Sequence, residues 1–567
     1  MVPLEILVVI PKAWKKEVFL GPSLLFSASI DVRIRHSLNK EEEDFIVNRR
    51  KSSFPARGNI KVKNIALLGS GGGQRAMVGL LGSLVELKEA GLLDSILYLS
   101  GVSGSTWCMA SLYQEPDWST KLETVKDKII KRLNGPGVSW GDVFEKLKKY
   151  YKEKDIFSLT DLWAVMVVPT FVKEIDESTL THQWDHCSKD PFPIYTVIDK
   201  QCKHQVDGDP WFEISPYEAG YSHIGAFVET PIFGSQFDKG SKEKQQPEID
   251  MLYLQALCGS AIADSVDEIL NSIWQKVKDF FDYLFPQIKT GKDPNNPPAE
   301  CFQVLMDLVN MNVDVLNAKD PSALDKSIRE SLNELTEDKG QLIPIKKLNL
   351  ADKEAAKWYM EKYTMDVCNC LSDWFKCFPF DLICSILKCA AQRIWGRKYN
   401  FLHNIIDETV PPALLEHETR DYIDAGLMDN SPYFSVLREE RNIDLIISLD
   451  FSEGDPFLTL TQTSDKCKKL KIHFPKVPPF SEEDKKNPKS FYVFEGPNAP
   501  TVIHIPLFNV VNCGDKIEDY QKKYGTFKFP YSAEKITELM ELAGKNISNN
   551  IEKLKEQIWV KDVPGAN

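Results

Sequence analysis

The sequence predicts an α/β protein whose sheet is interrupted by a long, mostly helical insertion. Near the start of the chain, an apolar strand over residues 62–68 runs into a glycine-rich turn, residues 69–73, and then into a helical pattern. A second strand, residues 96–99, runs into the turn 101–105 and another helix. Repeated strand, turn and helix units are typical of parallel sheets. A third apolar strand, residues 444–450, returns late in the chain.

The remaining segments of the sequence are predicted to be mainly helical. Residues 38–51 are highly charged and predict a surface helix, and residues 533–556 predict a closing helix. Between about 117 and 398 the pattern is mainly helical, with apolar residues at helical spacing over 268–285. We interpret this interval as a large cap, or lid, inserted into the α/β core. The core with its cap spans 41–560.

Composition narrows the function. The 567-residue chain is 43% hydrophobic and carries a net charge of −13. Such an acidic chain does not fit general nucleic-acid binding, although a local basic patch could still meet a membrane. No apolar run is long enough to span a bilayer. Residues 1–40 predict an N-terminal extension of unknown role.

Five cysteines gather in the predicted cap. A zinc site favours tight C-x-x-C pairs. These cysteines are interleaved with large apolar residues instead, which favours buried structural thiols on helices. They are Cys368, Cys370, Cys377, Cys384 and Cys389.

Three motifs could carry chemistry. Ser103 lies in Gly-Val-Ser-Gly-Ser at a strand-to-helix turn, which exposes a serine as a nucleophile or is simply a Gly/Ser turn. The glycine-rich loop from Gly69 to Gly73 lacks both the P-loop and the Rossmann spacing, so an oxyanion hole is the better functional interpretation. Asp424, in Asp-Ala-Gly-Leu, is either a turn residue or a general base that takes the serine proton without a histidine.

Taken together, these motifs resemble a known family. Leu68 to Met77, Gly101 to Trp107 and Asp424 to Leu427 occur in the order found in the cytosolic (group IV) phospholipase A2 family, a patatin-like family with a Ser–Asp dyad. The likeness runs from about residue 40 to 555. It also includes the segments 211–221, 225–237, 450–457 and 505–515.

The resemblance implies roles for individual residues. Ser103 matches the nucleophile, Asp424 the base, and Gly72 and Gly73 the oxyanion hole. Arg75 matches an arginine needed for activity. Without a family to compare, Arg75 would pass as a solvated surface charge.

Arg441 has a separate implied role. It stands seventeen positions after Asp424, where the family has an arginine linked to the phosphate headgroup. A guanidinium near the catalytic turn suits a phosphodiester anion.

The implied activity is that of a calcium-independent phospholipase A2 and lysophospholipase, with possible transacylase activity. It needs no cofactor and no metal, and its partners are phospholipid and lysophospholipid substrates and a membrane surface. We expect a cytoplasmic protein that associates peripherally with intracellular membranes. A lipid-binding protein without catalysis, or a neutral-lipid acylhydrolase, are the alternatives.

Two departures from the family concern membrane attachment. Only about seventy residues precede the glycine turn, too few for a C2 domain of roughly a hundred residues. The last residues, 563–567, contain no cysteine that could be prenylated. The aromatic-rich stretches 269–285 and 374–395, with the loop 289–298, suggest a lid that opens at an interface.

Overall fold

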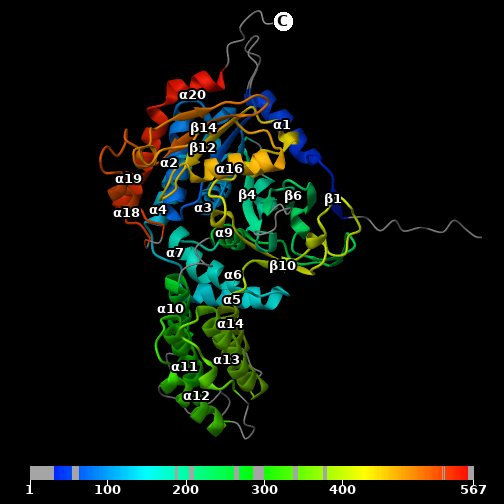
Figure 1. Ribbon diagram of the computed structural model, residues 1–567, viewed down its shortest axis with the longest axis vertical. Coiled ribbons are helices and arrows are strands. Elements are labelled where there is room, and N and C mark those ends of the chain that lie inside the picture. The colour runs from blue at the N-terminus through cyan, green and yellow to red at the C-terminus, as the bar shows by residue number, and fades with distance from the viewer. Residues whose placement is uncertain are drawn as a thin grey trace, which may run out of the picture.

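The structure is a computed structural model of the chain. It describes residues 31–53, 63–185, 189–202, 210–260, 267–284, 299–335, 342–374, 380–526, 528 and 530–559. A mixed sheet runs through the core, and a lobe of helices extends away from it (Figure 1).

The central sheet has twelve strands. Strand β11 (Thr419–Asp424) pairs with both β4 and β10 (Arg397–Tyr399). The other strands follow the spatial order β1 (Val32–Ile34), β7 (Ala226–Glu229), β6 (Glu218–Tyr221), β5 (Trp211–Ile214), β4 (Phe192–Asp199), β3 (Ile96–Gly101), β2 (Ile65–Gly69), β12 (Leu445–Asp450), β14 (Thr501–Pro506) and β13 (Tyr492–Phe494).

Strands β4, β3, β2, β12 and β14 are parallel, and the strands flanking them are antiparallel. The predicted α/β fold with a mixed central sheet is confirmed. β2, β3 and β12 are buried at every position, because parallel strands are covered on both faces.

Helices cover both faces of this centre. On one face, α2 (Gln74–Glu89) packs against α3 (Gly104–Tyr113) and α19 (Ala533–Ser548). The other face of β3 carries Tyr98 and Ser100, two positions apart and therefore on the same side of the strand. They bond to Glu42 of α1 (Lys40–Ser53) and Ser435 of α15 (Tyr433–Val436).

The middle of the chain differs from the prediction of a mainly helical stretch. Strands β4 to β7 fall within it and belong to the central sheet, and β8 (Gln236–Asp238) forms a hairpin with β9 (Ser241–Lys244). β4 is an unbroken buried strand, which gives no alternating pattern. β5, β6 and β7 have four residues each, too few for a period to show.

The helical part of the insertion falls into two groups. Helices near the core are α4 (Leu122–Leu133), α5 (Trp140–Glu153), α6 (Leu159–Leu162), α7 (Val168–Val172), α8 (Leu180–Trp184) and α9 (Met251–Cys258). The extended lobe holds α10 (Asp267–Leu284), α11 (Ala299–Leu316), α12 (Ser322–Leu335), α13 (Lys353–Trp374) and α14 (Phe380–Gln392) (Figure 1). The C-terminal part of the chain, after β12, also contains four further helices. They are α16 (Leu458–Leu470), α17 (Glu482–Lys486), α18 (Ile517–Lys523) and α20 (Ile551–Ile558).

The aromatic stretches predicted for a lid are largely packed inside the protein. On α10, Trp274, Phe280 and Phe281 are buried, whereas Tyr283 is 45% exposed. The loop 289–298 lies outside the described residues, so the lid stays a prediction. None of the described helices combines the length and the apolar character needed to cross a membrane.

The cysteine cluster lies on α13 and α14. Cys368, Cys384 and Cys389 are buried, and the first two are hydrogen-bonded to each other. Cys370 is half-buried, and Cys377 lies outside the described residues. The interpretation as buried cysteines on helices is confirmed for Cys368, Cys384 and Cys389, whereas Cys370 is on a helix but partly exposed.

Candidate active site

Two turns leave the sheet side by side. β2 and β3 are parallel neighbours, with Gly69 opposite Gly101, so the turns that follow them start from the same edge. The Val102 N–H donates to the Gly69 carbonyl at 3.1 Å. The Ser105 hydroxyl donates to the Ser70 carbonyl at 2.6 Å. These bonds fix the serine turn against the glycine turn.

Glycines allow the two turns to touch. A Cβ on Gly104 would stand 1.7 Å from the carbonyl oxygen of Gly73, so no larger residue fits there. A Cβ on Gly71 would stand 3.0 Å from the Cβ of Ser103. The glycine-rich loop and Ser103 are therefore in contact, as their sequence positions predict for neighbouring parallel strands.

Ser103 has a strained backbone. Its φ is 52° and its ψ is −125°, values that residues other than glycine rarely adopt. It directly precedes α3, and only 6% of the residue is exposed. A serine on a sharp, strained turn between a strand and a helix is the arrangement of a nucleophile elbow.

The glycine loop presents backbone donors beside this serine. Gly72 and Gly73 have φ values of 150° and 56°, which are open to glycine and disfavoured for other residues. The Gly71 N–H is bonded to the Asn430 carbonyl at 2.9 Å. In the part of the chain that the structure describes, no acceptor is bonded to the N–H of Gly72 or of Gly73. Both groups can therefore donate to a negatively charged oxygen.

Asn430 supports this loop, and the sequence analysis did not single it out. Its side-chain amide donates to the Gly71 carbonyl at 3.2 Å and to the Ser452 hydroxyl at 2.9 Å. The Ser452 hydroxyl in turn donates to Asp450 at 2.6 Å, and burial raises the pKa of Asp450 to about 7. The one signal in the sequence was its place six residues after Asp424.

Arg75 is buried behind the loop rather than exposed on the surface. Its side chain donates to the Phe451 and Tyr524 carbonyls, both at 2.6 Å, and to the Thr526 hydroxyl at 3.1 Å. A Cβ on Gly72 would stand 2.8 Å from one of its guanidinium nitrogens. Burial lowers the pKa of Arg75, and its contacts tie two distant segments, one at Phe451 and one at 524–526, to the glycine loop.

The pairing of β11 with β4 sets the position of Asp424. β5 pairs with one edge of β4, and the other edge is shared by β3 and then by β11. Gly101 is opposite Tyr195, and Asp424 is opposite Val197, two positions further along. Ser103 is likewise two positions beyond Gly101. Both residues therefore meet the same stretch of β4.

The Asp424 carboxylate lies in a buried environment. Asp424 is fully buried, and its Oδ1 accepts a bond from the Gly426 N–H at 2.8 Å. Buried Cys258 is hydrogen-bonded to Thr106, in the first turn of α3. Burial, followed by the charge of Asp424, raises the pKa of this thiol well above its usual value. Asp424 thus lies within electrostatic range of Cys258 on α9, and the Cys258 thiol is bonded to Thr106 of α3.

Among the contacts of the described residues, none joins the Ser103 hydroxyl directly to the Asp424 carboxylate or to a histidine nitrogen. Catalytic hydrogen bonds are often long before substrate binds. Buried His504 is bonded through Nε2 to the Pro456 carbonyl at 2.8 Å, and burial lowers its pKa to about 4.

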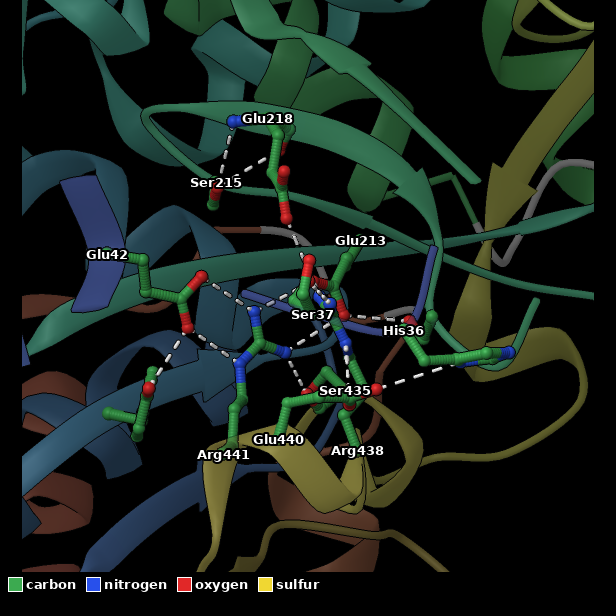
Figure 2. Close-up of polar contacts among 12 residues, drawn as sticks. His36, Ser37, Glu42, Glu213, Ser215, Glu218, Ser435, Arg438, Glu440 and Arg441 are labelled. Atoms are coloured by element: carbon green, nitrogen blue, oxygen red, sulfur yellow. Dashed lines mark hydrogen bonds and ion pairs between the residues drawn. The ribbon is translucent and has the colours of Figure 1, made fainter. Parts of the chain in front are cut away.

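Arg441 does not have the exposed position that headgroup binding requires. Figure 2 shows its guanidinium between Glu42 and Glu213. Its five N–H groups are used by these two carboxylates and by the Ser435 carbonyl. The side chain is 0% exposed. The predicted role of Arg441 in substrate binding is therefore corrected to a structural one, because a fully bonded, buried guanidinium offers no donor to a lipid phosphate.

Comparison with known proteins agrees with the family predicted from the sequence. A family model described as a lysophospholipase catalytic domain matches residues 65–296. Cytosolic phospholipase A2 gamma of Mus musculus is 34% identical over 539 residues, which cover 88% of this chain and 87% of the relative. The Homo sapiens protein of that name is 31% identical over 551 residues, covering 94% and 96%.

The fold has a solved counterpart as well. The structure of human GIVD cytosolic phospholipase A2 matches with a TM-score of 0.63 at 21% identity. The match covers 94% of this chain and 66% of that chain. At this identity the likeness speaks for the fold.

From these matches, the protein is a phospholipase A2 hydrolase with a lysophospholipase catalytic domain. Within that class, the chain belongs to the cytosolic phospholipase A2 family. The family resemblance and the type of enzyme predicted from the sequence are confirmed.

Proposed function

We propose that this enzyme hydrolyses acyl esters of glycerophospholipids and lysophospholipids through an acyl-enzyme on Ser103. The observation that carries the proposal is the contact between the strained Ser103 turn and the glycine loop whose backbone donors lie beside it. The Ser103 hydroxyl attacks the ester carbonyl carbon, and Asp424 takes its proton. The N–H groups of Gly72 and Gly73 donate to the oxygen that becomes negative.

The second half of the reaction mirrors the first. The tetrahedral intermediate collapses, and the departing lysophospholipid oxygen takes the proton back from Asp424. Water then attacks the acyl-serine, Asp424 takes its proton, and Ser103 leaves protonated with release of the fatty acid. A lysophospholipid hydroxyl in place of water gives the transacylase reaction.

Asp424 suits the part of a base because it is fully buried at the end of β11. An ionised carboxylate accepts hydrogen bonds, so it can take the serine proton once the hydroxyl comes within hydrogen-bond reach. Arg75 acts as a positioning residue: it holds Phe451, Tyr524 and Thr526 against the loop that carries Gly72.

The largest expected effect on activity concerns the dyad. Ser103→Ala and Asp424→Asn should each lower the hydrolysis of phosphatidylcholine at least about a thousandfold, because each removes a group that takes part in bond making. The assay uses phosphatidylcholine labelled separately on each acyl chain, which also reports whether sn-2 is preferred.

Asp421→Asn is the matched control, since Asp421 lies on the same strand but pairs with Arg397 at the surface. A fluorophosphonate probe, of the kind bound to human GIVD cytosolic phospholipase A2 in a solved complex, should label wild type and not Ser103→Ala. A folded histidine variant without activity would replace the dyad by a triad. Absence of both labelling and turnover in wild type would instead indicate a lipid-binding protein.

We also propose that catalysis needs no calcium and takes place at a cytoplasmic membrane surface. The described residues contain no group of three or more acidic, histidine or cysteine side chains placed to hold a metal ion. Hydrolysis of vesicle phospholipid should therefore continue in EGTA. A large loss that added calcium restores would refute this part. Vesicles compared with neutral-lipid emulsions test the remaining alternative, a neutral-lipid acylhydrolase.

A further inference from the structure

A small cavity lies away from Ser103, where the helical insertion meets the sheet. Its volume is about 60 Å³, several times the roughly 10–15 Å³ that one water molecule needs on the same measure. Helix α5, the segment 246–250 and strand β10 surround it, and these elements lie together in Figure 1. The lining residues that matter below are Lys154, Lys398, Tyr150, Asp250, Glu153 and Glu248.

Lys398 is the unusual member of this set. It is the central residue of β10, it lines the cavity, and only 7% of it is exposed. Its ammonium nitrogen lies 3.9 Å from the ring centroid of Tyr253. Its stem passes close to Gly234, where a Cβ would stand 3.2 Å from the Lys398 Cδ. Among the described residues, none accepts a hydrogen bond from this ammonium and no carboxylate forms an ion pair with it.

The nearest carboxylates are already engaged by other groups. Asp161 forms an ion pair with Lys154 at 2.6 Å. Asp250 forms one with Lys146 at 2.7 Å and accepts a bond from the Tyr150 hydroxyl at 2.6 Å. Lys146 and Lys154 thus pair with the two carboxylates of this place, and Lys398 is the lysine that has no carboxylate partner among the described residues.

The acids nearer the surface are engaged by groups other than Lys398. Glu248 is bonded to the Thr181 hydroxyl at 2.6 Å, and Glu177 bridges Lys146 and Lys149 at the rim. Glu153 is exposed and forms no ion pair with Lys398.

Lys154 adds a second cation to the same place. Its ammonium lies 3.8 Å from the Tyr253 ring centroid, so this ammonium and that of Lys398 stand over one aromatic ring. Two like charges held close together in a buried site repel each other. Burial first, and then the charge of Lys154, lower the pKa of Lys398 to about 7, against weaker opposing effects of Asp161 and Asp250.

We propose that this cavity binds a small oxyanion of the phosphate type, held by the ammonium groups of Lys398 and Lys154. A lysine is a common phosphate ligand because it acts as a point charge. We assign the cavity to the free ion rather than to the phosphate of a lipid headgroup. Since Lys154 follows α5 and Lys398 lies on β10, a bound anion would join the insertion to the sheet.

The test is a titration of the full chain with inorganic phosphate at pH 6.5, followed by thermal unfolding and by ³¹P NMR line width. Potassium chloride of equal ionic strength is the reference. Wild type should show a saturable rise in Tm and a broadened phosphate resonance. Lys398→Met should lose both, Lys398→Arg should keep them, and Lys239→Met, which removes an exposed lysine, should behave as wild type.

Two further measurements keep the test decisive. At pH 9 the Lys398 amine is neutral, so phosphate binding to wild type should fall without any substitution. Vesicles with and without phosphatidic acid should be bound equally by wild type and Lys398→Met, because the assigned ligand is the free ion. Equal phosphate responses in wild type and Lys398→Met, or no phosphate-specific response in wild type, would overturn the proposal. Lipid binding that depends on Lys398 would overturn the assignment to a free ion.

Discussion

Two buried cations, Arg441 and Lys398, differ in how many of their N–H groups have a hydrogen-bond or ion-pair partner. Around Arg441, each of the five guanidinium N–H groups has an oxygen partner, and the carboxylates of Glu42 and Glu213 are bonded in return (Figure 2). Around Lys398, one ammonium is left without an anion among the described residues. All N–H groups of Arg441 are bonded, so it is a structural residue. The Lys398 ammonium has no anionic partner among the described residues. Burial of a cation alone therefore does not distinguish a structural residue from a ligand site.

The largest effect on stability should come from Arg441→Met. It leaves Glu42 and Glu213 as buried carboxylates without their shared partner, and breaking a buried ion pair in this way costs about 3–5 kcal/mol. Urea denaturation at pH 7 measures the loss. A matched change at Arg397, which pairs with Asp421 near the surface at 2.7 Å, should cost about 1 kcal/mol or less. Equal losses at the two sites would remove the contrast between them.

The Arg441 cluster should also make the free energy of unfolding depend on pH in acid. Burial alone would raise the pKa of Glu213, but the charges of Arg441 and Arg438 outweigh it and lower that pKa to about 2, below the ordinary 4.5. A lowered carboxyl pKa stabilises the folded state above pH 4.5, and this contribution is lost as the pH falls toward 2. Relative to Glu213→Gln, wild type should lose on the order of 3 kcal/mol of unfolding free energy across that window. Parallel pH profiles of the two proteins would contradict the assignment.

At Lys398, neutralising the charge should stabilise the protein, whereas at Arg441 it should destabilise it. The folded pKa of Lys398, about 7, lies below its ordinary 10.5. Between these values the unfolded chain holds more protons, so unfolding free energy rises with pH from 7 to 10.5. In phosphate-free buffer at pH 6, Lys398→Met should gain at least about 1.4 kcal/mol, the equivalent of one pKa unit. The gain should shrink toward pH 10, and a loss of stability at pH 6 would show that the ammonium has a partner.

The smallest effect should be that of Lys239→Met, whose side chain is 71% exposed. Surface substitutions of this kind change stability by about 0.5 kcal/mol or less at any pH. The same denaturation series measures it, and it sets the scale against which the Lys398 result is judged.

Much of the active site could be predicted from the sequence because it follows strand ends. A glycine-rich turn and a serine turn after two consecutive parallel strands must leave the same edge of the sheet, and they do so at Gly69 and Gly101. Asn430 could not be found in this way, since its contact with Gly71 joins residues 359 positions apart. The short strands β5 to β7 were missed because four residues carry no readable period.

The sequence by itself determined the α/β core, the order of its motifs and the residues that the family resemblance marks for catalysis, because these are local patterns of apolar spacing and turn chemistry. The tertiary structure alone decided what each charge does. Arg75 and Arg441 look alike in the sequence as basic residues in polar surroundings, yet both are buried and bonded to distant segments. Lys398 looks like an ordinary strand residue until Lys154 and Tyr253 are brought beside it. The energy of a charge depends on its solvent exposure and on its neighbours in space, and folding supplies both.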